Sequence, residues 1–285
     1  MLIDTHAHLN FSAFDKDRDI LIKKCLKNNI WMINIGTSYE TSKKAIEIAE
    51  NFPQGVFAAI GLHPINLDTS LVKIKRDLLE SESFFVEREF DFEKYEKLAN
   101  PPVGGKKVVA IGEIGLDYYY RPKTTRKKEL FKQKQKDLLL KELSLAKKLN
   151  LPVIFHCRVA HQDLIRFLLD NKEIRPQAAV AHGFVGNLKE LQKYLDFGFY
   201  IGFNGIIFKE IEEIDFKENI IKTPLERILI ETDCPYLAPP DFPEERNNPL
   251  TTKYILKEIS EIKKIPQENL EKITNENARK LFNLF

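Results

Sequence analysis

An α/β fold in which eight parallel strands close into a barrel is predicted by three features of the 285-residue sequence. Eight short apolar runs recur along the chain, separated by longer charged stretches with apolar residues at helical spacing. The runs are apolar almost throughout, which is typical of strands covered by helices on both faces. The length also suits one barrel of about 250 residues. We therefore predict a (β/α)8 TIM barrel. A doubly wound open sheet is the alternative, but no glycine-rich first turn favours it.

The expected elements follow one another in alternation along the chain. The predicted strands are Leu2–His6, Ile30–Ile35, Val56–Leu62, Val108–Ile111, Val153–His156, Ala178–His182, Phe199–Phe203 and Arg227–Glu231. The predicted helices between them are Asp17–Asn28, Tyr39–Phe52, Thr125–Leu149, Ala160–Asn171 and Leu188–Phe197. The last of these has Asn187 as its expected N-cap and Gly198 as its expected C′ residue. Two further helices are expected from Pro249 onward.

One connection is longer than the alternation requires. More than 40 residues separate the third strand from the fourth, so residues 64–106 are predicted to be an insertion on the barrel, formed by a helix or a small hairpin. A solvated excursion is the simpler interpretation, and a lid over a substrate is the other. We expect residues 1–285 to form one domain.

The composition limits the classes of protein that are compatible with the sequence. Forty-four basic and 42 acidic side chains give a net charge of +2, so bulk electrostatics does not indicate a nucleic-acid binder. The basic run Lys123–Lys136 is interpreted as a solvated helix face, with a phosphate-binding patch as the alternative. Three scattered cysteines and the start MLIDTHAH, which has no apolar leader, predict a cytoplasmic protein without a membrane segment.

His6 and His8 lie at the end of the first predicted strand. Side chains at positions i and i+2 of a strand point to the same side, so both imidazoles can face the barrel mouth and bind one metal ion. Two histidines on one strand face are also found in cores and on surfaces without any metal. The pair alone therefore leaves the question open.

Further ligand-type residues fall at the same place in other predicted strands. Glu113, His156 and His182 end or follow the fourth, fifth and sixth strands, and Asp233 follows the eighth. The carboxyl ends of barrel strands supply the catalytic residues of TIM-barrel enzymes. The six residues predicted to bind metal are therefore His6, His8, Glu113, His156, His182 and Asp233.

These six ligands exceed what a single catalytic ion normally takes from a protein. Two divalent ions that share a carboxylate and a hydroxide would use all of them. Glu113, on a central strand, is the expected bridging carboxylate, and Asp233 is expected to orient or deprotonate the water. Both are assigned as catalytic. The sequence does not distinguish among Mg, Mn and Zn.

Seven ordered motifs extend over nearly the whole chain: LIDTHAHL, GLHP, AIGEIGLDYY, PVIFHCR, HGFVG, ETDCPYLAP and RNNP. Together they resemble the TatD-type deoxyribonucleases, which are amidohydrolase-like metal-dependent hydrolases. The resemblance implies that His6 and His8 hold one ion with Asp233, that His156 and His182 hold the other, and that Glu113 bridges the two. It also implies cleavage of phosphodiester bonds in DNA, often from a 3′ end.

Several positions depart from this pattern. Val159 replaces an aspartate, Gly183 and Val185 replace a cysteine and a serine, and Asn248 replaces a glutamate of RNEP. None is an expected ligand. The departures therefore concern hydrogen bonds around the site, and with them rate and substrate preference.

Three residues are predicted to bind substrate. The resemblance places His63, in GLHP, near a substrate phosphate, and a core or rim histidine is the alternative. Arg158 lies two residues after His156 and is expected to contact phosphate, with a structural salt bridge as the competitor. Arg246 is a weaker candidate of the same kind. We expect His161 to be a surface residue.

The predicted function is a metal-dependent hydrolase of DNA, acting as a 3′ exodeoxyribonuclease on single-stranded or frayed ends. A hydrolase of another substrate on the same site, such as a tRNA ester, an amide or a small-molecule ester, is the first alternative. A non-enzymatic binding protein on the same barrel is the second. No obligate protein partner is indicated. Tyr118, Tyr119 and Tyr120 are compatible with base stacking at the site mouth and equally with packing.

Overall fold

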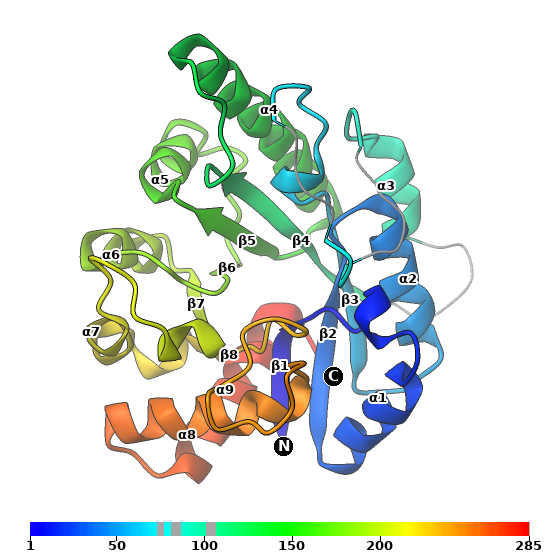
Figure 1. Cartoon of the computed structure of the whole chain (residues 1–285), viewed down its shortest axis with the longest axis vertical. Helices are drawn as coiled ribbons and strands as arrows, with labels where there is room; N and C mark the ends of the chain where they lie inside the picture. Colours follow the sequence, from blue (N-terminus) through cyan, green and yellow to red (C-terminus); the bar gives the residue numbers. More distant parts are fainter. Residues whose placement is uncertain (73–76, 81–86, 101–106, 285) are drawn as a thin grey trace.

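The computed structural model describes residues 1–72, 77–80, 87–100 and 107–284. Eight parallel strands form one sheet in the order β1 to β8, as the sequence predicts (Figure 1). Their bounds are β1 Leu2–Ala7, β2 Ile30–Ile35, β3 Val56–Ile60, β4 Val108–Asp117, β5 Val153–Arg158, β6 Ala179–Ala181, β7 Tyr200–Phe203 and β8 Ile228–Ile230.

The barrel closes between its first and last strands. The Thr5 hydroxyl donates to the carbonyl of Ile230, and Ala7 forms a parallel bridge with Cys234. The closing contacts thus include residues that follow β8, which brings this loop to the end of β1. The TIM-barrel prediction is confirmed.

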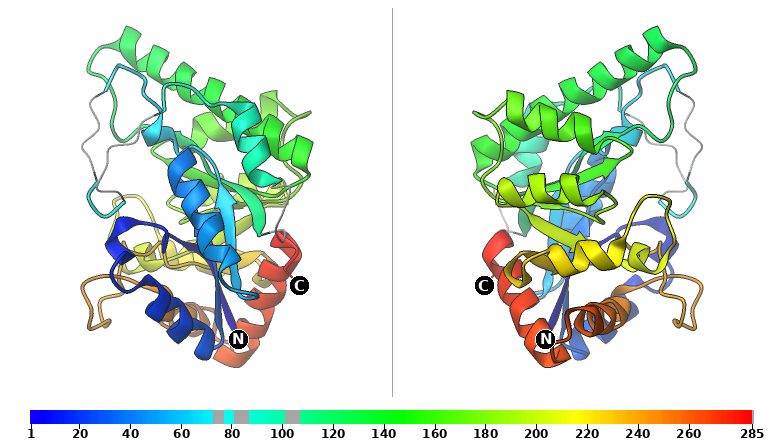
Figure 2. Two further views of the ribbon diagram at one scale, coloured as in Figure 1. Left: turned by 90° about the vertical axis from the view of Figure 1, so that its right-hand side faces the viewer. Right: turned by 90° about the vertical axis from the view of Figure 1, so that its left-hand side faces the viewer.

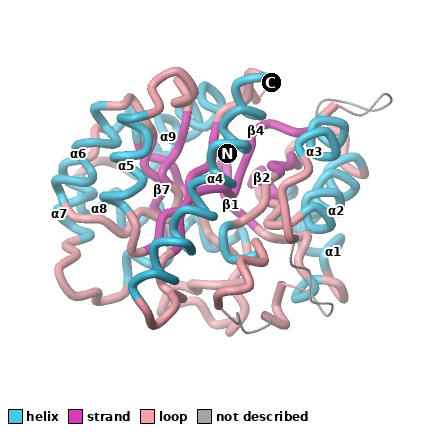
Figure 3. The backbone as a smooth tube through the Cα atoms, turned by 90° about the horizontal axis from the view of Figure 1, so that it is seen from above, coloured by secondary structure: helices cyan, strands magenta, loops and turns pink. Residues whose placement is uncertain are grey.

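Helices surround the strands (Figure 3). Their bounds are α1 Arg18–Lys27, α2 Tyr39–Glu50, α3 Phe92–Ala99, α4 Thr125–Leu149, α5 His161–Asp170, α6 Leu188–Asp196, α7 Phe216–Lys222, α8 Thr252–Lys263 and α9 Gln267–Phe282. The Asn187 side chain caps α6 in a capping box, and Gly198 follows the helix with a φ of +79°, both as expected. The short helix α7 is an element that the sequence analysis did not predict.

Strand β4 is longer than expected, because it continues past Ile111 to Asp117. Glycines within it conceal this continuation, since glycine is normally depleted in strands. Here the glycines allow close approach to β5: a Cβ on Gly115 would lie 2.0 Å from the carbonyl oxygen of His156. The extension carries Glu113 and Asp117 out to the end of the barrel.

The connection between β3 and β4 is an insertion, as predicted, and its helix is α3. Part of the remainder, including Phe84 and Phe85, lies outside the described residues. Two described pieces are held against the barrel. Glu87 accepts a hydrogen bond from the amide of Tyr39, the first residue of α2, at 2.6 Å, and Tyr236, in the loop after β8, donates to Asp77 at 2.7 Å.

The core has two parts. One cluster fills the space between the barrel and its helices. The other occupies the barrel interior, where Ile3, Ile154, Val180 and Leu229 pack with Phe282 of α9. Helix α9 therefore closes the amino-terminal end of the barrel, near which the two chain termini also lie (Figure 2). The carboxyl end of the barrel is left for the polar residues.

Candidate metal centre

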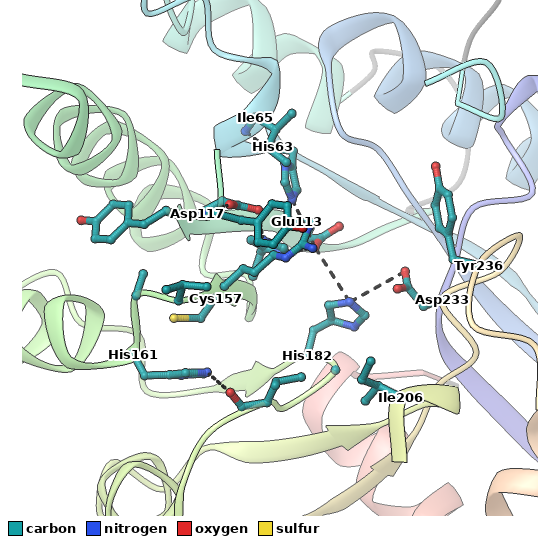
Figure 4. Close-up of a pocket in the computed structure, with 18 of the residues that line it drawn as sticks. His63, Ile65, Glu113, Asp117, Cys157, His161, His182, Ile206, Asp233 and Tyr236 are labelled. Atoms are coloured by element: carbon teal, nitrogen blue, oxygen red, sulfur yellow. Dashed lines mark hydrogen bonds and ion pairs between the residues drawn. The ribbon is translucent and has the colours of Figure 1, made fainter. Parts of the chain in front are cut away.

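Seven of the predicted site residues converge at the carboxyl end of the barrel. They arrive on β1, β4 and β5 and on the segments that follow β1, β3, β6 and β8. Figure 4 shows His182 between Glu113 and Asp233, with His63 beside Glu113. The converging residues are His6, His8, His63, Glu113, His156, His182 and Asp233.

The two carboxylate oxygens of Glu113 face different imidazoles. Its Oε2 lies 3.3 Å from Nε2 of His6 and 3.9 Å from Nε2 of His8. Its Oε1 lies 2.6 Å from Nδ1 of His156 and 3.8 Å from Nε2 of His182. Burial opposes ionisation of Glu113, but the surrounding imidazoles outweigh it and hold the pKa of this carboxyl well below its usual range. Glu113 is therefore an anion at the centre of the cluster.

The backbone of β1 fixes Asp233 in place. Its amide donates to the His6 carbonyl at 2.8 Å, and the next residue, Cys234, accepts from the His8 amide at 3.0 Å. Asp233 adopts a left-handed φ of +58°, a conformation in which aspartate is enriched among non-glycine residues. This turn places its Oδ1 3.3 Å from Nε2 of His8.

His6 supplies the test of whether a cation fits here. The side chain is fully buried, and neither ring nitrogen has a hydrogen-bond partner among the described residues. Burial and the neighbouring His182 lower the pKa of His6 to about 4, so the ring is neutral. A neutral nitrogen that faces a carboxylate oxygen without a hydrogen bond is unfavourable, and a metal ion satisfies both atoms. His6, His8 and Glu113 each offer one atom that can bind a metal ion, and these three atoms lie within 4.8 Å of one another.

Two acidic residues that sequence reasoning missed hold ligand-type histidines. Nδ1 of His182 donates to Glu231 at 2.9 Å, and Nε2 of His156 donates to Asp117 at 3.0 Å. Burial opposes charge on both rings. The neighbouring carboxylates nevertheless raise the pKa of His182 to about 10 and that of His156 to about 9. Such carboxylate partners fix the orientation of metal-binding imidazoles.

The signal for Glu231 was present in the sequence. It follows the interior residue Leu229 by two positions in the predicted strand Arg227–Glu231, so the period-2 rule points both into the barrel. Glu231 also needs room: a Cβ on Gly202 of β7 would lie 2.1 Å from its Oε1. Asp117 was hidden because β4 was expected to stop at Ile111.

The cluster opens into a cavity of about 1250 Å³. Arg158 lines this cavity, and its guanidinium carbon lies 3.7 Å from the ring centroid of Tyr119. Arg246 differs from the expectation. It is not among the residues that line the cavity, and its guanidinium forms a two-bond ion pair with Asp17 at 3.0 and 2.5 Å. The structural salt bridge that was the alternative for Arg158 is thus found at Arg246.

His161 also departs from the sequence-based expectation of a surface residue. Only 7% of it is exposed, Nδ1 accepts from the Tyr194 hydroxyl at 2.9 Å, and Nε2 donates to the Val185 carbonyl at 3.0 Å. The amphipathic face of α5 turns inward at this first residue. His161 is a buried structural histidine.

Of the positions that depart from the family pattern, Val159, Gly183 and Val185 line the cavity, whereas Asn248 is not among the lining residues. Val159 is 62% exposed on the cavity wall with a φ of +57°, which is strained for a β-branched residue. Gly183 has a φ of +47°, and a Cβ there would lie 2.8 Å from the amide nitrogen of Asn204. Asn248 accepts a hydrogen bond from the Leu250 amide at 3.1 Å.

One protein family matches nearly the whole chain. The profile of the TatD-related DNases matches residues 3–283. The chain belongs to this family. The resemblance drawn from the motifs is confirmed, and with it membership of the metal-dependent hydrolases. Within the described residues, no helix is long and apolar enough to span a membrane.

Relatives within the TatD family cover the whole chain. An uncharacterized metal-dependent hydrolase, YabD of Bacillus subtilis, is 32% identical over 286 residues. The match covers 100% of this chain and 100% of the relative. The 3′-5′ ssDNA/RNA exonuclease TatD of Pectobacterium atrosepticum is 30% identical, with 99% of this chain and 100% of the relative covered. The crystal structure of YJJV, a TatD homologue of Escherichia coli, has a TM-score of 0.79 at 28% identity, covering 100% of this chain and 98% of that one.

Proposed function

We propose that this protein is a 3′–5′ exonuclease that hydrolyses phosphodiester bonds of single-stranded DNA with two divalent cations. The placement of Glu113 carries the proposal. One of its oxygens faces His6 and His8, and the other faces His156 and His182. A carboxylate flanked in this way is suited to bridge two ions.

The proposed ligands divide into two groups around that bridge. His6, His8 and Asp233 would hold one ion, and His156 and His182 would hold the other. Bound there, Mg, Mn or Zn ions would lower the pKa of a water molecule and offset negative charge on a phosphodiester.

The remaining steps belong to side chains of the protein. His8 and neighbouring imidazoles outweigh burial and lower the pKa of Asp233, so its carboxylate stays ionised and can orient a water or take its proton. Arg158 lines the cavity and is the proposed contact for a non-bridging phosphate oxygen. His63, whose Nε2 lies 3.5 Å from Oε1 of Glu113, is proposed to contact the same phosphate.

The choice of substrate and direction has a different basis. The Pectobacterium atrosepticum relative is a 3′-5′ ssDNA/RNA exonuclease at 30% identity over nearly the whole chain. The cavity is also wide enough for a nucleotide, since its volume is about 1250 Å³.

Cleavage of 5′-labelled single-stranded DNA with Mg, with Mn, with Zn and with EDTA tests this proposal. We expect stepwise shortening from the 3′ end that EDTA abolishes. Glu113→Ala should lower the bound metal measured by elemental analysis and reduce cleavage by more than the roughly 10–100-fold typical of residues that only orient ligands. Asp233→Asn should reduce cleavage as well.

Glu212→Ala is the matched control, because Glu212 lines the cavity and is exposed but makes no contact with the histidine cluster. It should retain both metal and activity. Full cleavage by Glu113→Ala would refute the assigned centre. A metal-loaded wild-type protein that leaves single-stranded DNA intact would refute the substrate and favour another ester.

A further inference from the structure

One part of the cavity rim is apolar and exposed. It is formed where β4 and β5 end, by Tyr119, Tyr120 and Val159, with exposed fractions of 53%, 42% and 62%. The rings of Tyr119 and Tyr120 are perpendicular to one another, with centroids 4.9 Å apart. Exposed large apolar side chains that gather beside a functional cavity commonly mark a binding surface.

The same rim is built directly onto the proposed metal centre. Asp117, which accepts from His156, also accepts a hydrogen bond from the Tyr119 amide at 2.8 Å. The Tyr118 amide donates to the Arg158 carbonyl at 2.9 Å, which joins the ends of the two strands. The backbone of Tyr119 is therefore tied to the paired ends of β4 and β5 and to Asp117, the carboxylate that accepts from His156.

Arg158 orders the aromatic surface further. Its guanidinium lies over the Tyr119 ring at 3.7 Å. A cation on one face of an aromatic ring is favourable and holds the ring in one orientation. Since more than half of Tyr119 is exposed, a planar group can still reach the ring from the cavity.

The distribution of charged side chains around the cavity favours this rim as the place where a polyanion binds. Most of the charged side chains that line the cavity are acidic. The carboxylates that line it away from the histidine cluster are Asp77, Glu80, Asp163, Glu190, Glu212 and Glu213. The lysine and arginine side chains among the described lining residues are Lys132 and Arg158, both on the β4–β5 side.

Only one of these two cations is available. Lys132 lies 3.5 Å from Asp163 and 3.9 Å from Glu129, whereas Arg158 has no carboxylate within 4.0 Å in the described part of the chain. A strand of nucleic acid is repelled by the acidic walls and attracted at Arg158.

We propose that Tyr119, held by Arg158, is a stacking subsite for an unpaired base of the nucleic-acid strand that enters the cavity over the ends of β4 and β5. This inference rests on the proposed function and adds the route of the strand and the group that recognises it. Stacking on an aromatic face tolerates every base and requires that the base be unpaired. The subsite would thus select single strands without selecting sequence.

A cycle of two changes isolates the contact between Tyr119 and a base. The protein is changed by Tyr119→Ala, and the single-stranded oligonucleotide by abasic residues introduced one position at a time near its 3′ end. Binding is followed by fluorescence anisotropy and cleavage by KM and kcat. We expect Tyr119→Ala to weaken binding and raise KM about tenfold on the normal strand, with kcat little changed. When the abasic residue stands at the position that would stack on Tyr119, Tyr119→Ala should change binding and KM little further.

Matched variants separate stacking from structure. Tyr119→Phe keeps the ring and should restore binding, while Tyr254→Ala removes a tyrosine that does not line the cavity and should leave KM unchanged. Equal effects of Tyr119→Ala on normal and abasic strands at every position would overturn the subsite. If base-dependent binding is found without any cleavage, the subsite stands and the exonuclease proposal falls.

Discussion

The two ends of the barrel are built from the same rows of inward-facing side chains but serve different purposes. At the amino-terminal end, Ile154 and Val180 pack with Phe282 of α9 in an apolar cluster. Two residues further along the same strands, the rows continue as His156 and His182, which face the carboxylates of the candidate metal centre. Position along a strand therefore decides whether an interior side chain contributes to stability or to chemistry.

The two ends also differ in what burial costs. The transfer of apolar side chains out of water is favourable, so packing at the amino-terminal end stabilises the barrel. At the carboxyl end, Glu113 and Glu231 are buried carboxylates, which is unfavourable unless charges of opposite sign compensate. We therefore expect substitutions at the first end to change stability and substitutions at the second to change metal binding.

The largest expected effect on stability is at the closed end. Phe282→Ala removes a side chain that is only 2% exposed and leaves a cavity against the barrel interior. The free energy of unfolding should fall by about 3–5 kcal/mol, with kcat per folded molecule unchanged at 25 °C. Urea unfolding and cleavage assays on the same preparation measure both quantities.

Lys280→Ala is the control on the same helix, because Lys280 is exposed and should change stability little. A Phe282→Ala protein that is as stable as the wild type, or that is folded but inactive, would contradict the separation of the two ends.

A smaller effect is expected from Glu231→Gln at the open end. Glutamine keeps the shape of the side chain but removes its negative charge. In the wild type, Oε2 of Glu231 accepts hydrogen bonds from Nδ1 of His182 and from the amide of Gly183, both at 2.9 Å. Metal affinity should fall about 10–100-fold, as is typical when a carboxylate partner of a ligand is lost. Isothermal titration with Mn or Zn measures this change.

Glu212→Gln carries the same chemical change at an exposed position on the cavity wall. If both variants bound metal as tightly as the wild type, Glu231 would not support a ligand. A loss of affinity in both would point to the overall charge of the cavity instead.

The strand ends show why the site could be predicted so far from sequence. In β5 the interior residue Ile154 and the site residue His156 differ by two positions, so simple alternation finds the ligand. In β1 the interior Ile3 and the site residue His6 differ by three, because the register shifts between Asp4 and Ala7. Such an irregularity re-aims a side chain and leaves no clear mark in the sequence. The HxH spacing still identified the pair.

Other parts of the site depended on tertiary contacts that periodicity does not encode. Arg158 is the last residue of β5 and Arg246 lies in the loop after β8. Only the structure shows that Asp17, far away in sequence, pairs with Arg246. Glu231 belonged to a predicted strand, but its role depends on the space left by Gly202. The fold could be predicted from the pattern of apolar residues. The roles of these polar residues could be assigned only once their contact partners in the structure were known.

The last effect is confined to acidic pH and concerns a histidine at the open end that is not part of the centre. Burial lowers the pKa of His161 to about 4, below the value of about 6.5 expected in the unfolded chain. The folded protein therefore holds this ring neutral, and its contribution to stability is present above pH 6.5 and lost as the pH falls towards 4. Between pH 7 and pH 5 the loss should be about 2 kcal/mol.

His161→Gln tests this contribution, because glutamine can still donate to the Val185 carbonyl but does not titrate. The metal-free wild type and variant are unfolded with urea at pH 7 and at pH 5. The other histidines titrate alike in both proteins, so the difference between the two pH-dependent changes isolates His161. We expect the variant to lose about 2 kcal/mol less than the wild type on acidification. Identical losses would mean that His161 already accepts a proton in the fold, and the neutral ring bonded to Tyr194 and Val185 would be wrong.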